Sequence, residues 1–172
     1  MKKILPFLLI LFGCVKIPEG IEPVGNFELD KYLGKWYEIA RLDHPFERGL
    51  INVSAEYKLG KKEEVVVINR GYNKKKQKWQ EVKGKAYFVD NINKRGFLKV
   101  SFFGPFYGSY VIIELDKENY QYALVCGPIR NYLWILSREK QLPDEIKNKL
   151  ISKAKSLGFK IEKLIWVEQS GN

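Results

Sequence analysis

Few residues in this chain have the type and spacing that catalysis requires. The chain holds one histidine, His44, which stands before Pro45 in a loop-like stretch and offers poor material for a nucleophile–histidine–carboxylate triad. Of the two cysteines, Cys126 lies in the apolar run YALVCG, which is typical of a buried thiol. The motifs HExxH, CxxC and GxGxxG and the P-loop are absent from the sequence. The sequence therefore predicts no catalytic centre, no metal site and no cofactor.

The first fourteen residues have the features of an export signal that ends in a lipid attachment site. Two lysines precede the apolar segment Ile4–Phe12, and the small residue Gly13 stands before Cys14. The sequence LFGC at residues 11–14 resembles the bacterial lipoprotein signal, which implies that Cys14 is lipidated and becomes the mature N-terminus. Val15 occupies the position where an aspartate would retain the protein in the inner membrane, so we expect an anchor in the outer membrane, facing the periplasm. The alternative is a secretory signal with a chance cysteine.

The remaining sequence divides into a tether and one folded domain. We expect residues 1–13 to be the signal peptide, residues 14–26 a lipidated tether with two prolines and two glycines, and residues 27–172 the domain. Removal of the two lysines of the signal lowers the formal net charge from +10 to +8. In an exported chain this basic balance favours an anionic membrane surface or an anionic ligand, and we expect no nucleic-acid partner.

The domain reads as an all-β protein followed by one helix. Short runs rich in Val, Ile, Tyr and Phe alternate with polar turns, and several runs have one apolar and one polar face. An apolar stripe predicts a helix over residues 143–157, and residues 159–167 form a ninth, final strand. The short connections predict an eight-stranded antiparallel up-and-down barrel, with open two-sheet packing as the alternative. The eight expected strands are residues 36–41, 50–59, 64–72, 79–89, 96–103, 107–115, 120–126 and 132–138.

Three motifs stand in order at the ends of expected strands: GKWYEIAR (34–41), YQYALVCGP (120–128) and YLWILSR (132–138). With the helix and the IWV that follows it, they resemble the lipocalins, and specifically the lipidated outer-membrane lipocalins of bacteria. The resemblance covers the mature chain and implies a calyx for a small hydrophobic ligand. Strand parity brings Arg138 beside Trp36 near Gly34, and in this family that cation–π pair seals the barrel floor. The resemblance to the bacterial proteins also allows a homodimer.

The period-2 alternation of the strands predicts which side chains line the calyx. If Arg138 points inward at the floor, Leu136, Trp134 and Tyr132 share its face, and Trp134 lies in the middle of the barrel. In the sixth strand, Val111 and Ile113 are assigned to the inward face on the assumption that Glu114 faces water. In any strand, a register shift of one residue would exchange the inward and outward faces. The other expected wall residues are Val53, Ala55, Tyr57, Val65, Val67, Asn69, Phe88, Phe102, Val111, Ile113 and Val125.

Strand parity also assigns four loops to the open end of the barrel. These loops are rich in basic and aromatic residues, so we expect a basic, aromatic mouth that contacts the head group of a ligand. Each loop taken alone also fits an ordinary solvated charge run, and their convergence on one end favours the ligand-facing role. The expected head-group residues are His44, Arg48, Lys74, Lys75, Lys76, Tyr107 and Arg130.

These observations favour a lipid-anchored binding protein that stores or transports a fatty acid or lysophospholipid inside its barrel, and not an enzyme. One alternative is a lipocalin-type enzyme that acts on a lipid. Cys126 is its only thiol candidate, and the expected inward face with Ala123 and Val125 points that thiol away from the calyx. The other alternative is a basic envelope-surface adhesion module, which predicts a barrel interior filled by side chains.

Overall fold

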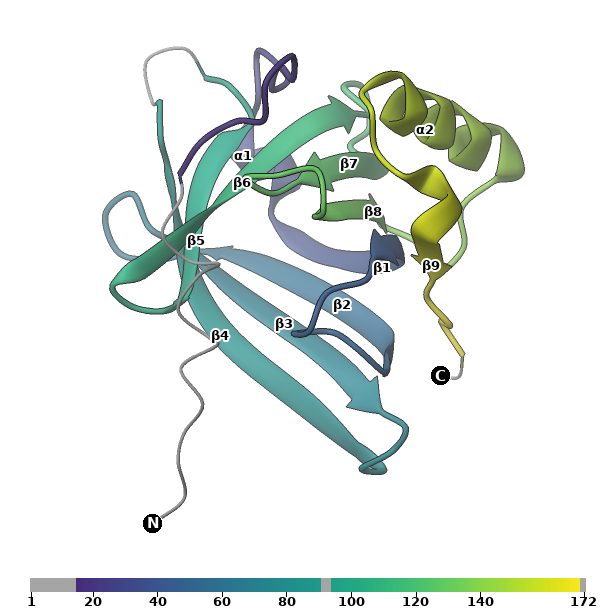
Figure 1. The fold of residues 1–172 in the computed structure, drawn as a ribbon. Coiled ribbons are helices and arrows are strands. Elements are labelled where there is room, and N and C mark those ends of the chain that lie inside the picture. The colour runs from purple at the N-terminus through teal and green to yellow at the C-terminus, as the bar shows by residue number, and fades with distance from the viewer. Residues whose placement is uncertain (1–14, 91–93, 171–172) are drawn as a thin grey trace.

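A computed structural model describes residues 15–90 and 94–170 of the chain. The expected signal peptide and Cys14 lie outside the described residues. The first eight described strands form an antiparallel meander, and β1 pairs with both β2 and β8, which closes the barrel (Figure 1). The strands are β1 (Gly34–Leu42), β2 (Leu50–Leu59), β3 (Val65–Asn73), β4 (Lys78–Phe88), β5 (Phe97–Phe103), β6 (Phe106–Leu115), β7 (Tyr122–Cys126), β8 (Leu133–Ser137) and β9 (Leu164–Trp166).

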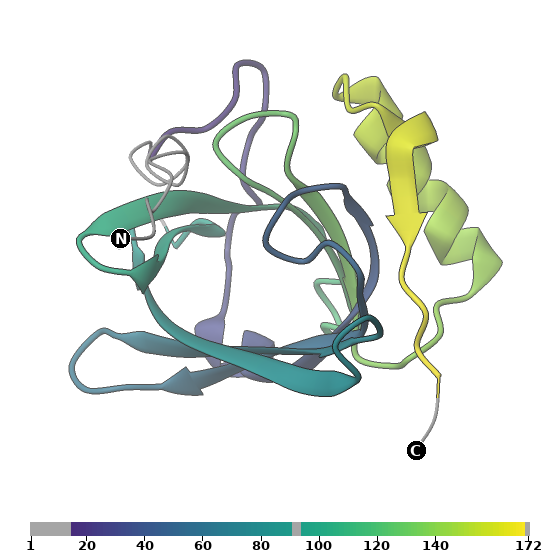
Figure 2. The same cartoon turned by 60° about the horizontal axis from the view of Figure 1, so that its bottom comes forward.

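Two helices and a short 3₁₀ turn complete the fold: α1 (Leu29–Tyr32), α2 (Asp144–Ser156) and η2 (Ile161–Lys163). Figure 2 shows α2 and β9 outside the ring of strands, on one flank of it. The barrel, the C-terminal helix and the short ninth strand are confirmed. The ninth strand is shorter than expected because residues 161–163 form a 3₁₀ turn, so that only Leu164–Trp166 pair with β1 as a strand.

The fold has one core outside the barrel and another within it. In the outer core, Leu150 and Ala154 of α2 are buried against Val111, Leu133 and other outward side chains of β1 and β6–β8. In the inner core, Trp36, Tyr57 and Val65 are among the buried residues. The amphipathic stripe of α2 therefore covers the apolar outer face that a barrel in water could not leave exposed.

The floor of the barrel is built on the contact between Arg138 and Trp36. The Arg138 guanidinium carbon lies 3.9 Å from the centroid of the Trp36 ring, and Trp36 is fully buried. Arg138 also donates hydrogen bonds to the carbonyl oxygens of Lys31 at 2.8 Å and Lys35 at 2.9 Å. Gly34 has φ +94°, which favours glycine, and a Cβ there would lie 3.4 Å from Arg138 Nη1. The sealing pair is therefore present as the resemblance implies.

The prediction that Val111 and Ile113 face the calyx is wrong. Both side chains belong to the outer core under α2, whereas their neighbour Ile112 belongs to the inner core. The pairing of β6 with β7 shifts between Ile112 and Glu114, which marks a β-bulge. The bulge turns Ile113 and Glu114 to the same outer side, so that the assumed outward Glu114 does not force Ile113 inward.

The segment expected to be a tether packs on the barrel over its described part, residues 15–26. It has no helix or strand, but Ile21 is buried in the outer core. The Val24 amide donates to the Ile112 carbonyl at 2.9 Å, and the Val24 carbonyl accepts from Gly96 at 2.8 Å. These bonds satisfy the Ile112 carbonyl next to the bulge of β6 and the Gly96 amide just before β5.

We expect Arg138→Ala to lower the free energy of unfolding by about 3 kcal/mol, because it removes a desolvated cation–π contact and hydrogen bonds from a charged donor. Urea unfolding at neutral pH measures the change. Arg138→Lys should lose less, since it keeps the charge but not the planar fork. Arg48→Ala is the control, because Arg48 forms only an exposed ion pair with Asp43 and should unfold at the wild-type urea concentration. An Arg138→Ala midpoint equal to that of the control would contradict a sealing role.

Candidate functional site

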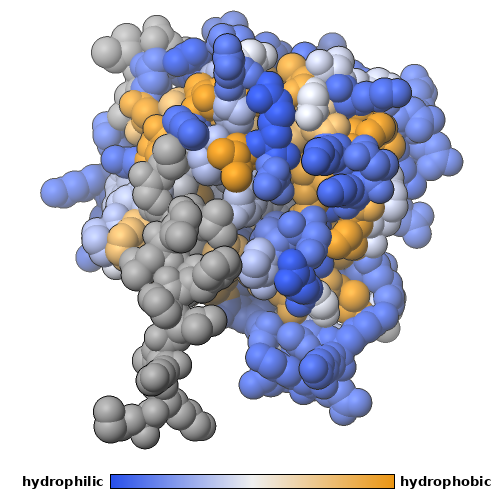
Figure 3. Space-filling model, viewed as in Figure 1, coloured by the Kyte–Doolittle hydropathy of each residue, from blue (hydrophilic) through white to orange (hydrophobic). Residues whose placement is uncertain are grey.

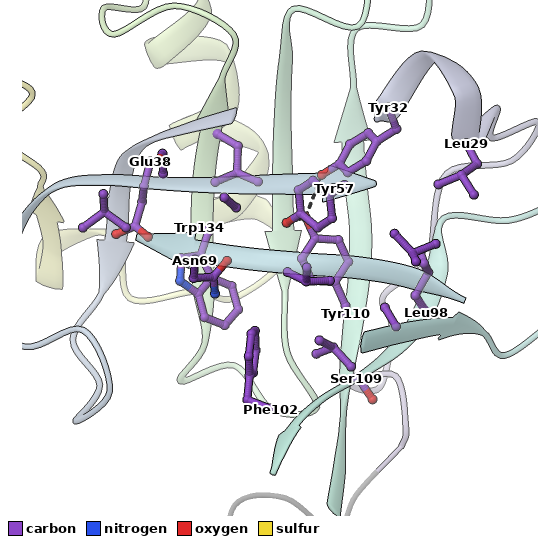
Figure 4. Close-up of a pocket in the computed structure, with 18 of the residues that line it drawn as sticks. Leu29, Tyr32, Glu38, Tyr57, Asn69, Leu98, Phe102, Ser109, Tyr110 and Trp134 are labelled. Carbon is purple, nitrogen blue, oxygen red and sulfur yellow. Dashed lines mark hydrogen bonds between the residues drawn. The ribbon is translucent and has the colours of Figure 1, made fainter. Parts of the chain in front are cut away.

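Two adjoining cavities lie inside the barrel above its sealed floor. The inner chamber, next to α1, has a volume of about 110 Å³, and the outer chamber, next to the mouth, about 300 Å³. The two chambers share lining residues at mid-height, among them Val53, Asn69, Phe102 and Trp134. The lining of the inner chamber is predominantly apolar, with Leu29, Val65 and Leu98 in its walls. Figure 4 shows these walls, with Trp134, Asn69 and Phe102 near the centre of the space.

The alternation of the strands places most expected wall residues correctly. Ten of them line one or both chambers: Val53, Ala55, Tyr57, Val65, Val67, Asn69, Phe102, Tyr132, Trp134 and Leu136. Phe88 and Val125 belong to the inner core but line neither chamber, because Phe88 packs beside Phe27 at 5.9 Å between ring centroids and Val125 is fully buried. These side chains lie inside the barrel, and their contact with a ligand stays a prediction.

Three tyrosine hydroxyls meet at the wall of the inner chamber, an arrangement that the sequence did not suggest. Tyr110 Oη lies 2.7 Å from Tyr32 Oη and 2.7 Å from Tyr57 Oη, as Figure 4 shows. Burial raises the pKa of each of the three phenols above its ordinary value. Tyr110 was missed because the sixth strand was assigned the opposite face, and Tyr32 because α1 was not anticipated. The chain of hydroxyls gives each phenol oxygen a hydrogen-bond partner at an apolar cavity, and its two bonds use two of the three hydroxyl protons.

A second polar cluster lies where the inner and outer chambers meet. Arg41 Nη1 donates to Glu38 Oε1 at 2.8 Å, and Arg41 Nη2 donates to the carbonyl oxygen of Glu47 at 2.7 Å. Glu47 Oε2 lies 2.7 Å from His44 Nε2 and accepts a hydrogen bond from Trp134 Nε1 at 3.0 Å. The cluster therefore ties the loop between β1 and β2 to the neighbouring strand β8.

The two carboxyl groups of this cluster have pKa values shifted in opposite directions. Burial and the neighbouring Glu47 raise the pKa of Glu38, although Arg41 opposes them. Burial also opposes ionisation of Glu47, but the contacts with His44 and Trp134 outweigh it and lower the pKa of Glu47. Glu47 is therefore the ionised carboxylate that faces the chambers. No sequence pattern predicts that Glu47 faces the cavity. Glu38, in contrast, shares the period-2 face of Trp36, so alternation could have placed it inside.

Of two expected head-group residues, His44 lies buried in the wall of the outer chamber and Arg48 lies outside both chambers. His44 lines the outer chamber but is only 5% exposed, because its ring packs 5.4 Å from Trp134 and 5.7 Å from Tyr132. Arg48 lines neither chamber and forms a bidentate contact with Asp43. His44 is therefore a structural member of the buried cluster as well as a wall residue.

The remaining expected head-group residues do not line the outer chamber. Tyr107 packs outside the barrel with Tyr87, at 6.3 Å between ring centroids, and under Lys99 Nζ at 5.2 Å. Arg130 bonds to the carbonyl oxygens of Leu157 and Glu19, because the end of α2 lies closer to its guanidinium than the mouth does. These two assignments are wrong. Lys74, Lys75 and Lys76 lie exposed in the turn between β3 and β4, away from the cavity lining.

The charged lining of the outer chamber is therefore mixed and not basic. Besides His44 and Glu47 it includes, at the entrance, the largely exposed Arg70 and Glu81, which pair with each other at 3.2 Å on the solvent side of the strands. Asn69 Oδ1 and His44 Nδ1 are buried there with no hydrogen-bond partner within the described ranges. A polar ligand group that donates or accepts hydrogen bonds would satisfy such atoms.

Thiol and metal chemistry find little support in the described part of the chain. Cys126 is buried in the outer core, away from both chambers, and burial raises its pKa to about 12. In residues 15–90 and 94–170 no three His, Cys, Asp or Glu side chains gather as a metal site would require. Over the same residues, no helix has the length and apolar character needed to cross a membrane.

Known proteins of one family are similar to this chain over nearly its whole length. The family described as lipocalin-like domain matches residues 27–169. An outer membrane lipoprotein Blc of Vibrio cholerae is 55% identical over 160 residues, which cover 93% of each chain. The protein of the same name in Escherichia coli K12 is 51% identical over 166 residues, covering 96% of this chain and 93% of that one.

Solved structures agree on the fold. Insecticyanin from the tobacco hornworm Manduca sexta superposes with a TM-score of 0.73 at 22% identity, covering 93% of this chain and 89% of that one. At this identity the likeness concerns the fold alone.

The tyrosine cluster predicts a loss of stability at alkaline pH. A phenol whose pKa is higher in the folded than in the unfolded chain contributes stability below the unfolded value of about 10, and this contribution is lost as the pH rises toward the folded pKa. Tyr110→Phe should make the fall in unfolding free energy above pH 10 shallower, and should cost about 1 to 3 kcal/mol at pH 7 because two buried hydroxyls lose their partner. Urea unfolding from pH 7 to 11.5 measures both effects.

Tyr107→Phe is the matched control for this experiment. Tyr107 lies half-buried outside the barrel, so its loss of a hydroxyl should leave both the stability at pH 7 and the alkaline slope at wild-type values. Equal alkaline slopes for Tyr110→Phe and wild type would contradict the raised phenol pKa values.

Proposed function

The chain belongs to the lipocalin family, among the outer-membrane lipoproteins of bacteria, and from this premise we propose that its barrel binds a fatty acid or lysophospholipid. The protein stores or carries this ligand and does not convert it. Its place is the outer membrane, where Cys14 would hold the lipid anchor after removal of residues 1–13.

The observation that carries this proposal is a mainly apolar cavity that is closed at the floor and has charged side chains at its entrance. The inner chamber ends at the sealed floor and is lined mainly by aliphatic and aromatic side chains, which suits an acyl chain. Both chambers share the Glu47 carboxylate, and the outer chamber adds the Arg70–Glu81 pair at its entrance. A single-chain amphiphile that enters tail first would place its head group at these charges.

The mixed charges of the outer chamber favour a zwitterionic lysophospholipid over a fatty acid. A fatty acid would bring one carboxylate near Glu47 and Glu81, where like charges repel. A zwitterionic head group could place its phosphate toward Arg70 and its ammonium toward a carboxylate or an aromatic face. The lysophospholipid is therefore the preferred member of the proposed ligand class.

The two alternative functions receive less support from the geometry. A lipid-modifying enzyme would need an activated nucleophile at the chambers, but Cys126 lies outside the barrel wall and His44 is held by Glu47. An adhesion module with a filled barrel conflicts with two chambers in the interior.

Native mass spectrometry of protein purified from membranes tests ligand binding directly. We expect one bound lysophospholipid per chain, and a change of Trp134 fluorescence when a lysophospholipid or a fatty acid of the same chain length is titrated. The lysophospholipid should bind more tightly. Failure of both lipids to bind or to change the fluorescence would overturn the proposal.

Ala55→Trp should weaken lysophospholipid binding by about tenfold or more. The indole would occupy part of the inner chamber and displace at least two methylene groups of the acyl chain, each contributing about 0.8 kcal/mol. Leu59→Trp, at an exposed position of the same strand, is the control and should bind as the wild type does. Equal weakening by both variants, or by neither, would place the acyl chain elsewhere.

A further inference from the structure

Four exposed aromatic side chains surround the open end of the barrel. Phe46 lies between β1 and β2, Trp79 at the start of β4, and Phe103 and Phe106 face each other across the β5–β6 turn. Phe46 and Phe103 also line the outer chamber, so this aromatic rim borders the mouth itself. Single exposed apolar residues are ordinary, but four aromatic ones around a cavity entrance mark an interaction surface.

Exposed lysines lie beside the aromatic rim. The turn between β3 and β4 presents Lys75, Lys76 and Lys78 to solvent, and Lys78 precedes Trp79. This hairpin projects at the bottom of Figure 1, opposite α1, and its end is strongly hydrophilic in Figure 3. The nearby carboxylates are engaged, since Asp43 pairs with Arg48 and Glu168 with Lys74. The lysines therefore give this end an excess of positive charge.

The described N-terminus lies on the outside of the barrel wall, beside β6. The Lys16 amide donates to Ser109 Oγ at 2.8 Å, and Ser109 Oγ donates to the Lys16 carbonyl at 2.6 Å. Ser109 lies three residues after Phe106 and lines both chambers, at mid-height of the barrel. Cys14 is one peptide bond before Val15, and one residue adds at most about 3.8 Å between Cα atoms. An acyl anchor on Cys14 would thus attach within a few residues of the barrel wall, and the rest of the described segment leaves the mouth uncovered.

We propose that the open end of the barrel docks on the anionic surface of the bilayer that holds the anchor. The aromatic rim would enter the head-group layer while the lysines meet lipid phosphates, a combination typical of interfacial binding. The entrance of the outer chamber then faces lipid and not water. This docking does not depend on which ligand the barrel binds, so ligand binding in solution would survive its failure.

Quenching by brominated lipids tests which face meets the membrane. The lipidated protein, purified from membranes, is reconstituted in vesicles of phosphatidylethanolamine and phosphatidylglycerol with brominated phosphatidylcholine. All variants carry Trp134→Phe, so that lipid inside the barrel does not contribute. Trp79 and Trp166 are a matched pair, because they are 53% and 49% exposed but lie at the mouth and on the flank.

We expect Trp79→Phe to reduce the quenched fraction at least twofold, and Trp166→Phe to leave it unchanged. Loss of quenching in Trp166→Phe instead, or equal effects in both, would overturn the proposal. The proposal would also be overturned if Trp79 became less accessible as the protein-to-lipid ratio rises, with no quenching by the brominated lipid. That result would indicate that this face contacts a second copy of the chain.

Charge reversal tests the role of the lysines. The triple variant Lys75→Glu, Lys76→Glu, Lys78→Glu should lower Trp79 quenching at least twofold at low salt. The control Lys153→Glu, Lys155→Glu, Lys160→Glu makes the same charge change at exposed positions in and after α2 and should not. Equal loss in both variants would show a response to net charge alone and contradict docking by this end.

Discussion

The stacking of Arg138 on Trp36 is the contact on which the rest of the structure depends. It joins the end of β8 to the start of β1, and its hydrogen bonds reach the carbonyl groups around α1. A barrel of eight strands has room for a ligand only if side chains do not fill it, and an unfilled barrel needs one end closed to exclude water. Because the guanidinium seals one end with a planar, charged group, the interior above it can remain open and apolar.

The buried Glu38–Arg41–His44–Glu47 cluster sets a second constraint. Placing two carboxyl groups and a guanidinium inside a barrel is costly unless each finds a partner, and here they pair with one another and with Trp134. Their location at mid-height fixes the boundary between the apolar inner chamber and the polar outer chamber. The indole of Trp134 lines both chambers and bonds to Glu47, so one side chain joins the packing of the wall to its polarity.

The sequence alone predicts the barrel, and it predicts the wall residues wherever the strand pairing is regular. Period-2 alternation places Ala55 and Tyr57 inside because β2 pairs with β3 without a register shift from Ser54 to Leu59. It fails in β6, where a bulge that no residue type announces turns Val111 and Ile113 outward. The contacts of long side chains are missed for another reason. Arg130 donates to a carbonyl that only the folded chain brings within reach, here that of Leu157 at the end of α2. Such long-range partners are properties of the closed structure and leave no local pattern.

The direction of the barrel follows from parity in the same way as its closure. In an eight-stranded meander every second connection lies at the same end, so the turn with Lys75 and Lys76 shares its end with the loops of Phe46 and Phe103. The floor residues occupy the opposite end and are constrained by packing around Trp36. The mouth has no such constraint, and solvated turns there could carry any polar residue. Aromatic side chains and uncompensated lysines at this end therefore call for a partner, and the described N-terminus beside Ser109 brings the anchored membrane within reach.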